Sequence, residues 1–424
     1  MLNGKKEHRE KNNTESKIGI IILGLLLVPV LVGDPQENSS IYLIMILSCT
    51  GFVLLFFNKQ HICKSQAFIL VTFLVLAFIQ LLGCFAADSM SVIRYPVYTI
   101  SIGIFVIVSI SILDEVNPLA MLVVCFCCMG VLLYRAVFVR GSEDLGNSLA
   151  GMAVFICVVL IFSGIKYSDY IKSAKPERHS SSCDWKKKII VVAMIIALLF
   201  FLVVIYESHA RSALFVLLII FSLFIILTLW KPKRKTLIFL FWFCIALGIL
   251  GIAAYINVRE FGWYSYLNNY SVELFGKNID TSRPLLWSMS IEALGDNWLT
   301  GLGTGFLPSF GRFTDVSFHN SYLQILVPNG IVALVCLILI FFFIWRELAS
   351  YADDVLVRLV LSAFIGILVY NCFEATLLSN KLGVGFLEWF VLSMGVARSL
   401  KLKDMYLSEK KLQRKRKDGN NFNL

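Results

Sequence analysis

Charged residues are scarce in this chain of 424 residues. Only 16% of the residues are Asp, Glu, Lys or Arg, whereas 58% are hydrophobic. A soluble domain of this length needs more charge than this on its surface. The low charge therefore excludes an ordinary soluble globular fold and indicates a chain that is surrounded mostly by lipid.

The sequence also lacks the residue spacing of a structural zinc site. It has 11 cysteines but only 5 histidines, and no Cys-x-x-Cys pair accompanies histidines at the spacing that zinc requires. Most of the cysteines lie inside apolar segments, where cysteine behaves as a small hydrophobic residue. We therefore expect no bound metal and no disulfide framework.

Long apolar runs dominate the chain. Twelve of them can be marked, at residues 18–32, 41–57, 66–84, 95–113, 118–138, 148–165, 189–206, 212–230, 237–256, 328–345, 358–375 and 382–398. Each is long enough to span the hydrocarbon core as a helix, and none shows the alternation of a barrel strand. The sequence predicts an all-α polytopic membrane protein with about twelve transmembrane helices, of which the first is an uncleaved helix.

Lysine and arginine gather in alternate connections between these runs. They crowd the N-terminal tail, the second, sixth and eighth connections and the C-terminal tail of residues 399–424. Because basic connections stay in the cytoplasm, both termini are predicted to be cytoplasmic. The fourth connection, with Asp114 and Glu115, departs from the pattern. This distribution accounts for the net charge of +10, so we favour a retention charge in the tail over a site for anionic lipid or nucleic acid.

One connection is much longer than the others and falls on the outer side. It covers residues 257–327, after the nine spans of residues 1–256 and before the three spans of residues 328–398. It is rich in Trp, Tyr and Phe, whereas a disordered linker would be poor in them. Long ordered loops often carry function, so we predict a partly helical outer loop that holds the site. No paired aspartates for a metal lie there, because Asp353 and Asp354 fall in a cytoplasmic connection.

Arg283 is the first candidate in this loop. It opens the segment SRPLLWSMSIEAL (282–294), whose apolar spacing and early Pro284 predict an amphipathic helix. Unpaired N–H groups and the helix dipole favour anions at such a helix start. Arg283 is therefore a candidate phosphate ligand, and the alternative is an ion pair with Asp280 or Asp315.

Two motifs follow in the same loop. The glycines of GLGTGF (301–306) could present N–H groups to phosphate, but a tight turn is the preferred interpretation. His319 lies at the start of HNSYLQILVPNG (319–330), in which Pro328 and Gly330 should break a short surface helix. A neutral histidine there could accept a proton from an acceptor hydroxyl, and a structural role is the alternative.

A further charged group lies at the outer junction of the seventh and eighth spans. The segment YESHARSALF contains Glu207, His209 and Arg211. Charges at this depth are costly unless they face a cavity or a partner, so they are candidates for function. The alternative is a simple ion pair between Glu207 and Arg211.

Three of these segments, in this order, resemble the O-antigen ligase and polymerase superfamily. HARSAL supplies Arg211, RPLLWSMSIEALGDNWLTGLGTGF supplies Arg283, Trp287, Gly301 and Gly303, and HNSYLQILVPNG supplies His319, Asn320, Tyr322 and Gly330. Asn147, before the sixth span, resembles a further asparagine of the family. The chain departs from the family pattern at Ala210, where serine is usual, and at Asn297-Trp298, where His-Pro is usual.

The resemblance implies an inverting glycosyltransferase that uses no metal and no cofactor. Its donor would be a glycan on undecaprenyl pyrophosphate, moved en bloc at the periplasmic face of a bacterial inner membrane. Arg211, Arg283 and His319 would be catalytic. The substrate-binding residues would be Asn147, Trp287, Gly301, Gly303, Asn320 and Tyr322.

Two acceptors fit this resemblance, and one other class of protein fits the hydropathy. An O-antigen ligase joins the glycan to lipid A–core, which we favour, whereas a polymerase joins it to a second lipid-linked unit. A lipid-linked sugar transporter would require internal repeats and charges at the bilayer midplane, neither of which the sequence shows clearly. We expect Arg211, Arg283 and His319 to converge at the outer boundary of the membrane around a diphosphate.

Overall fold

The computed structural model describes residues 62–85, 90–114, 116–138, 143–174, 181–208, 210–276, 278–280, 282–309, 316–379 and 382–420. Within these residues the regular structure is entirely helical. The long helices are α3 (Lys64–Cys84), α4 (Arg94–Ile112), α5 (Pro118–Phe138), α6 (Glu143–Ala174), α7 (Ser181–Glu207), α8 (Arg211–Trp230), α9 (Arg234–Ile256), α12 (Ser321–Ala349), α13 (Val355–Tyr370) and α14 (Leu382–Asn420). The shorter ones are η1 (Met90–Ile93), η2 (Val258–Glu260), α10 (Tyr264–Phe275) and α11 (Arg283–Leu294).

The all-helical, multi-pass prediction is confirmed, but the number of twelve spans is not. Every predicted span from 66–84 onward coincides with a helix, and the predicted spans 18–32 and 41–57 lie outside the described residues. Eight described helices are long and apolar enough to cross a membrane. The apolar parts of α7 and α13, Val191–Glu207 and Val355–Tyr370, are shorter than this.

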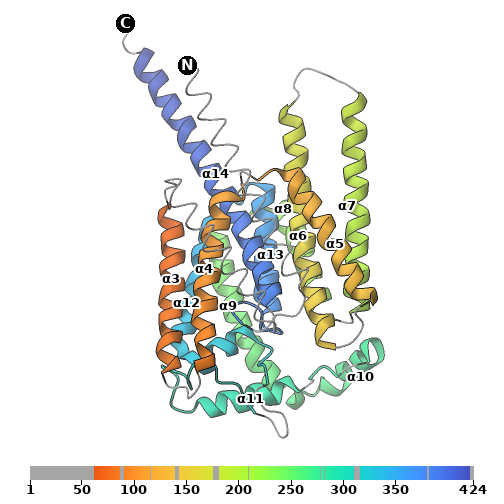
Figure 1. Ribbon diagram of the computed structural model, residues 1–424, viewed down its shortest axis with the longest axis vertical. Helices are drawn as coiled ribbons and strands as arrows, with labels where there is room; N and C mark the ends of the chain where they lie inside the picture. Colours follow the sequence, from red (N-terminus) through yellow and green to blue (C-terminus); the bar gives the residue numbers. More distant parts are fainter. Residues whose placement is uncertain are drawn as a thin grey trace.

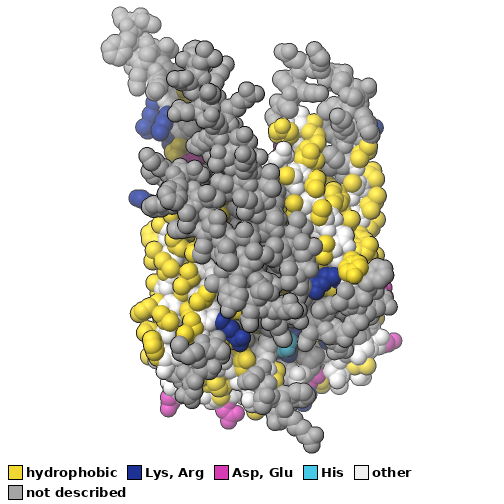
Figure 2. Space-filling model, viewed as in Figure 1, with side chains coloured by type: hydrophobic (Ala, Val, Ile, Leu, Met, Phe, Trp, Pro, Cys, Tyr) yellow, Lys and Arg dark blue, Asp and Glu magenta, His cyan; other side chains and the backbone are white. Residues whose placement is uncertain are grey.

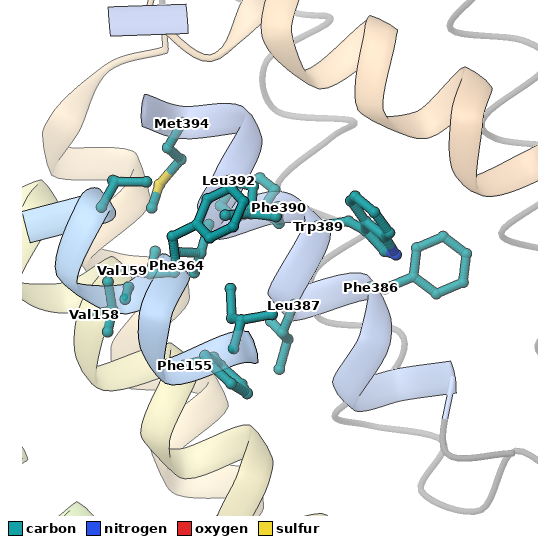
Figure 3. Close-up of a cluster of buried hydrophobic side chains, with 14 of the residues drawn as sticks. Phe155, Val158, Val159, Phe364, Phe386, Leu387, Trp389, Phe390, Leu392 and Met394 are labelled. Carbon is teal, nitrogen blue, oxygen red and sulfur yellow. The ribbon is translucent and has the colours of Figure 1, made fainter. Parts of the chain in front are cut away.

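The helices form a bundle around α14. Figure 1 shows the long helices side by side, and α14 packs against α4, α6 and α13. Its apolar part is 94% buried, whereas that of α9 is 11% buried and is therefore suited to face lipid. Figure 3 shows Phe155 of α6, Phe364 of α13 and Phe390 of α14 within the same buried cluster. The core thus joins the C-terminal helices to the middle of the chain.

The two ends of the bundle differ in structure. In Figure 1, α10 and α11 lie across the lower end, and α14 projects from the opposite end. We call the lower end the loop end. Figure 2 shows apolar side chains on the visible walls of the bundle and acidic side chains at the loop end. An apolar wall of this kind suits a helix bundle whose solvent is lipid.

The acidic fourth connection has a structural explanation at the end opposite α10 and α11. Asp114 lies 2.5 Å from Nζ of Lys401 and 3.5 Å from Nζ of Lys166. Its carboxylate is paired with two of the basic residues that set the predicted orientation. Asp114 therefore belongs with the basic side of the bundle, although its own connection carries no Lys or Arg.

Helix α12 begins at Ser321, earlier than the predicted start at residue 328, and is kinked near its start. Its backbone leaves helical angles at Gly330 (φ 77°, ψ 178°), just after Pro328. A break of this kind leaves helix carbonyls in need of other partners. The N–H of Gly303 donates to the carbonyl oxygen of Pro328 at 3.0 Å, and Leu302 donates to the preceding carbonyl at 2.9 Å. The glycine-rich loop therefore docks on the kink, so the predicted short helix and α12 are one kinked element.

The backbones of the loop and of α12 approach each other so closely that glycine is needed on both sides of the contact. A Cβ atom on Gly330 would collide with the carbonyl oxygen of Leu299, and one on Gly301 would collide with the Pro328 carbonyl group. Gly301 and Gly303 also have positive φ angles of 74° and 102°. The preferred interpretation of the loop as a turn agrees with this geometry, because the N–H groups of Leu302 and Gly303 donate to the kinked helix.

Replacing Gly330 with alanine should destabilise the protein by roughly 1–3 kcal/mol, because the new methyl group meets backbone at a positive φ. The measurement is the thermal unfolding midpoint of the detergent-solubilised protein. Gly251→Ala in α9 is the matched control, since nothing lies within 4 Å of a Cβ placed there. Equal midpoints for the two variants would contradict the docking of the loop on α12.

Helix α13 ends at Tyr370, before the predicted end of the span at residue 375. Residues 371–379 then form an irregular segment that is mostly buried. Irregular backbone at membrane depth is tolerated only where protein or a cavity supplies its hydrogen bonds. We call residues 371–379 the buried turn, and it contains a carboxylate, Glu374, that the sequence interpretation missed.

Candidate functional site

Glu374 lies at the centre of the candidate site. Its side chain is fully buried, and Oε1 lies 3.2 Å from Nη2 of Arg283. Oε2 of the same carboxylate lies 3.7 Å from Nδ1 of His319. One buried carboxylate thus holds together two of the three residues that the sequence predicts to be catalytic.

Arg283 reaches this carboxylate from the first turn of α11. Helix α11 starts after Ser282, with Pro284 in its first turn as predicted. The indole N–H of Trp287 donates to the carbonyl oxygen of Phe318 at 2.7 Å. That bond fixes α11 to the residue before His319. Trp287 is 1% exposed, so its position favours a role in placing Arg283 and His319 relative to each other.

The alternative interpretation, an ion pair of Arg283, holds with Glu374 as the partner and not with Asp280. Asp280 forms its ion pair with Arg259 instead. Burial raises the pKa of Asp280, but hydrogen bonds from Arg259 and Tyr264 outweigh this effect, and the net result is a lowered pKa. Asp280 is therefore committed to Arg259. The other suggested partner, Asp315, lies outside the described residues.

His319 has an unusual backbone for its residue type. Its φ angle is +48°, and its N–H donates to Oγ of Ser317 at 3.2 Å. Its Nδ1 is buried and has no hydrogen-bond partner among the described residues, while the side chain keeps 27% of its surface exposed. A positive φ is uncommon outside glycine and often marks a functional position. The ring therefore turns Nδ1 toward Glu374, and part of the side chain stays accessible.

Asn320 fixes the position of His319. Its side-chain oxygen caps α12 by accepting from the N–H groups of Tyr322 and Leu323 at 2.9 and 3.0 Å. Its amide nitrogen donates to the carbonyl oxygen of Cys372 in the buried turn at 3.0 Å. Because Asn320 is fully buried and both ends of its amide have protein partners, the structure gives it a positioning role.

Arg211 begins α8 at the loop end. Its guanidinium donates to Oγ of Ser271 in α10 at 2.6 Å and to the carbonyl oxygen of Asn278 at 3.1 Å. Its charge lies near enough to that of Arg283 for the two to repel. The alternative pairing with Glu207 is wrong, because Glu207 is exposed and forms no ion pair with a described residue. His209 lies outside the described residues.

Tyr255 of α9 lies between these parts of the site. Its hydroxyl donates to the carbonyl oxygen of Ile279 at 2.9 Å, and its ring lies 5.2 Å from that of Trp287. It also lies near the ring of Phe373, beside Glu374, with 6.4 Å between centroids. Tyr255 thereby links residues 278–280, which accept a hydrogen bond from Arg211, to helix α11, which carries Arg283.

A family model matches the middle of the chain. Residues 195–338 match the family model described as O-antigen ligase. The chain carries an O-antigen ligase family domain. The matched residues run from α7 into α12 and include Arg211, Arg283 and His319. No curated protein matches the sequence.

The other residues predicted to bind substrate lie around the cluster in different ways. The hydroxyl of Tyr322 donates to the carbonyl oxygen of Leu368 at 2.8 Å, so it joins α12 to α13. Gly301 and Gly303 lie on the kink of α12. Asn147 lies outside the matched range, yet its carbonyl accepts from the hydroxyl of Tyr370 at 3.2 Å, just before the buried turn. Asn147 is thus brought close to the site from a distant part of the chain.

Glu374 could have been noticed in the sequence. It was counted inside the apolar run 358–375, although a carboxylate within a predicted span is itself a candidate for function. The same holds for Glu388 in the run 382–398. Both lie after the matched O-antigen ligase domain, and neither belongs to a motif that drew attention to it.

The cluster of Arg211, Arg283, His319 and Glu374 combines groups suited to group transfer from a phosphate ester. Two guanidinium groups can bind the oxygens of a diphosphate through forked N–H donors. A half-buried imidazole beside them can accept a proton, and a carboxylate behind the imidazole can stabilise the charged ring. These groups lie at one end of the bundle, where the helices give way to the long connection.

Proposed function

We propose that the chain is an O-antigen ligase that transfers a glycan en bloc from undecaprenyl pyrophosphate to a sugar hydroxyl of lipid A–core. The family domain supports membership of the ligase and polymerase superfamily. The observation that carries the proposal is the buried Glu374 carboxylate shared by Arg283 and His319. Through it, an anion-binding group and a proton acceptor lie side by side, as transfer from a diphosphate requires.

The proposed location is the bacterial inner membrane, with the loop end in the periplasm and both termini in the cytoplasm. Helix α8 starts at the loop end with Arg211, so its other end and the connection to α9 lie away from the loop end. That connection carries Lys231, Lys233, Arg234 and Lys235. Basic connections favour the cytoplasmic side. The site would then face the compartment in which lipid-linked glycans and lipid A–core meet.

In the proposed reaction, Arg211 and Arg283 hold the diphosphate of the donor. The acceptor oxygen attacks the anomeric carbon, and the bond from that carbon to the phosphate oxygen breaks. The electron pair goes to undecaprenyl pyrophosphate, whose growing negative charge the guanidinium groups stabilise. Attack from the face opposite the leaving group inverts the anomeric centre.

In this proposal, Nε2 of His319 takes the proton of the acceptor hydroxyl. Its other nitrogen then faces Glu374, and the imidazolium that forms lies beside a carboxylate. The separation of 3.7 Å is longer than a hydrogen bond and would shorten as the ring becomes charged. Glu374 is therefore proposed to orient both His319 and Arg283 without touching the glycan.

For the remaining predicted substrate-binding residues we propose two kinds of role. Trp287, Asn320 and Tyr322 have their polar groups bound to protein carbonyls or helix N–H groups and would act by positioning. Gly301 and Gly303 would act in the same way through the kink of α12. Asn147 keeps its predicted role as a residue that contacts the glycan, since only its backbone carbonyl is engaged with Tyr370.

Glu374→Gln should lower the rate of glycan transfer by roughly 10- to 100-fold, because the neutral amide loses a charge-assisted contact to Arg283. The measurement is the initial rate with purified protein in detergent, together with the unfolding midpoint. Glu207→Gln is the control, since this exposed glutamate forms no ion pair with a described residue. A Glu374→Gln variant with the rate of the wild type would remove Glu374 from the proposed mechanism.

The proposed function is tested with purified protein, a lipid-linked glycan and each of two acceptors. A ligase should release undecaprenyl pyrophosphate and extend lipid A–core, while leaving a second lipid-linked unit unchanged. Extension of the second lipid-linked unit alone would identify a polymerase. Absence of transfer to both acceptors, with lipid-linked glycan crossing the bilayer of proteoliposomes, would replace the enzyme proposal with a transporter.

A further inference from the structure

A second buried carboxyl group lies behind the proposed site and takes no part in the mechanism above. Glu388, in the second turn of α14, is fully buried. Within the described part of the chain it forms no ion pair. A bare charge at such a position is costly, so an acid retained there needs partners or a neutral form.

The partners of Glu388 come from the buried turn on both sides of Glu374. Oε1 accepts a hydrogen bond from Nδ2 of Asn371 at 2.9 Å. Oε2 lies 2.9 Å from the hydroxyl oxygen of Thr376. Both contacts join α14 to the segment that carries Glu374. Glu388 therefore holds the turn at two points, one before and one after the carboxylate of the site.

The same turn is tied to the start of α12. The hydroxyl oxygens of Ser321 and Thr376 lie 2.5 Å and 2.9 Å from Oδ1 of Asn371. The N–H of Thr376 donates to the Ser321 hydroxyl at 3.0 Å. Ser321 follows the His319–Asn320 pair directly. The buried turn is thus fixed both to Glu388 and to the backbone that presents His319.

The hydrogen count in this cluster favours a protonated Glu388. The two hydroxyls make four oxygen–oxygen contacts. Ser321 contacts Oδ1 of Asn371 and, at the longer distance of 3.2 Å, the carbonyl oxygen of Glu374, and Thr376 contacts Oδ1 of Asn371 and Oε2 of Glu388. The hydroxyls of Ser321 and Thr376 supply one hydrogen each. The amide nitrogen of Asn371 is committed to Glu388 and to the carbonyl oxygen of Ile367, so its orientation is fixed. When both hydroxyls donate to Oδ1 of Asn371, a hydrogen on the carboxyl group of Glu388 fills the remaining short contact, with Thr376.

We propose that Glu388 is a neutral carboxylic acid that positions Glu374 against Arg283 and His319. It donates to Thr376, which donates to Asn371, while its other oxygen accepts from the Asn371 amide. This inference rests on the proposed function, because the distance between Glu374 and the two cationic groups matters only if they act together. Glu388 acts through the turn and touches no substrate.

Two substitutions separate this role from ordinary packing. Glutamine at 388 can accept from Asn371 through its carbonyl and donate to Thr376 through its amide, as the neutral acid does. Glu388→Gln should therefore keep kcat within about threefold of the wild type, and Glu388→Leu should lower kcat by about tenfold or more with little change in KM for the donor. Ser393→Ala, which removes a buried hydroxyl bonded only within α14, is the matched control with unchanged kcat.

A double-mutant cycle tests the path through Glu374. In a Glu374→Gln background, Glu388→Leu should add less than about twofold to the loss, because the group that it positions is already altered. If the loss of kcat in the double variant equals the product of the losses in the two single variants, Glu388 acts independently of Glu374, through the whole fold. A Glu388→Gln variant as slow as Glu388→Leu would overturn the neutral acid.

An infrared measurement tests the protonation without any need for activity. The resting wild type at neutral pH should show the carbonyl stretch of a protonated carboxylic acid, and this band should be absent in Glu388→Gln. If the band is the same in both proteins, the proposal for Glu388 fails. If the wild type transfers no glycan but the band is lost in the variant, the proposed function fails and the neutral acid stands.

Discussion

Substituting alanine for Arg283 should lower the rate of glycan transfer by about 10³-fold or more, the range observed when a charge-stabilising group is removed from a phosphoryl or oxyanion site. The Arg283→Lys variant should recover little of the lost transfer rate. It restores a charge but cannot fork onto two phosphate oxygens. Transfer rates of purified variants, measured at saturating acceptor, check both expectations.

The structure adds a requirement to this experiment. Removing Arg283 leaves Glu374 buried without one of its cationic partners, so part of any loss could come from instability. The double variant Arg283→Ala/Glu374→Gln removes that charge and should recover the unfolding midpoint while remaining inactive. Arg346→Ala, which removes a guanidinium from the far end of α12, should keep the rate of the wild type. Recovery of transfer in the double variant would contradict a role for Arg283 in binding the diphosphate.

Replacing His319 should lower the rate by about 10²- to 10⁴-fold, which is the contribution of a general base. His319→Asn is the preferred substitution, because asparagine tolerates the φ angle of +48° at this position better than alanine does. The unfolding midpoint and donor binding should stay close to those of the wild type, and kcat should fall.

The three substitutions together test the proposed cluster. Arg211→Ala is expected to behave like Arg283→Ala, since both arginines would face the same diphosphate. The three variants should be compared at equal levels of membrane insertion. If any two of them give glycan profiles near that of the wild type, the cluster is not a transfer site.

Much of the helical architecture follows from local sequence. Continuous apolar runs must form helices in lipid, because no other element satisfies every backbone group within one segment. For that reason the predicted spans from 66–84 onward coincide with helices. The predicted helix start at Arg283 is confirmed for a similar reason, since the polar segment before α11 ends where the helix begins.

Other features required the folded chain. Arg283 and Glu374 are 91 positions apart in sequence, and nothing near either residue indicates the other as its partner. The hydropathy of the run 358–375 even concealed Glu374, because a sum over many apolar residues hides one carboxylate. The glycine-rich loop had two possible roles in the sequence, and its contact with the Pro328 kink decided between them.

The sequence by itself determined the lipid-facing helical bundle, the long connection between α9 and α12 and three motifs that carry Arg211, Arg283 and His319. The transfer of an apolar run into lipid and the start of a helix depend on residues that are close in sequence, and their contributions to the free energy add along the chain. Only the tertiary structure decided that Glu374 joins Arg283 to His319 and that Glu388 supports the turn between them. Buried carboxylates are stabilised by partners that arrive from other helices, so their roles depend on the packing of the whole bundle.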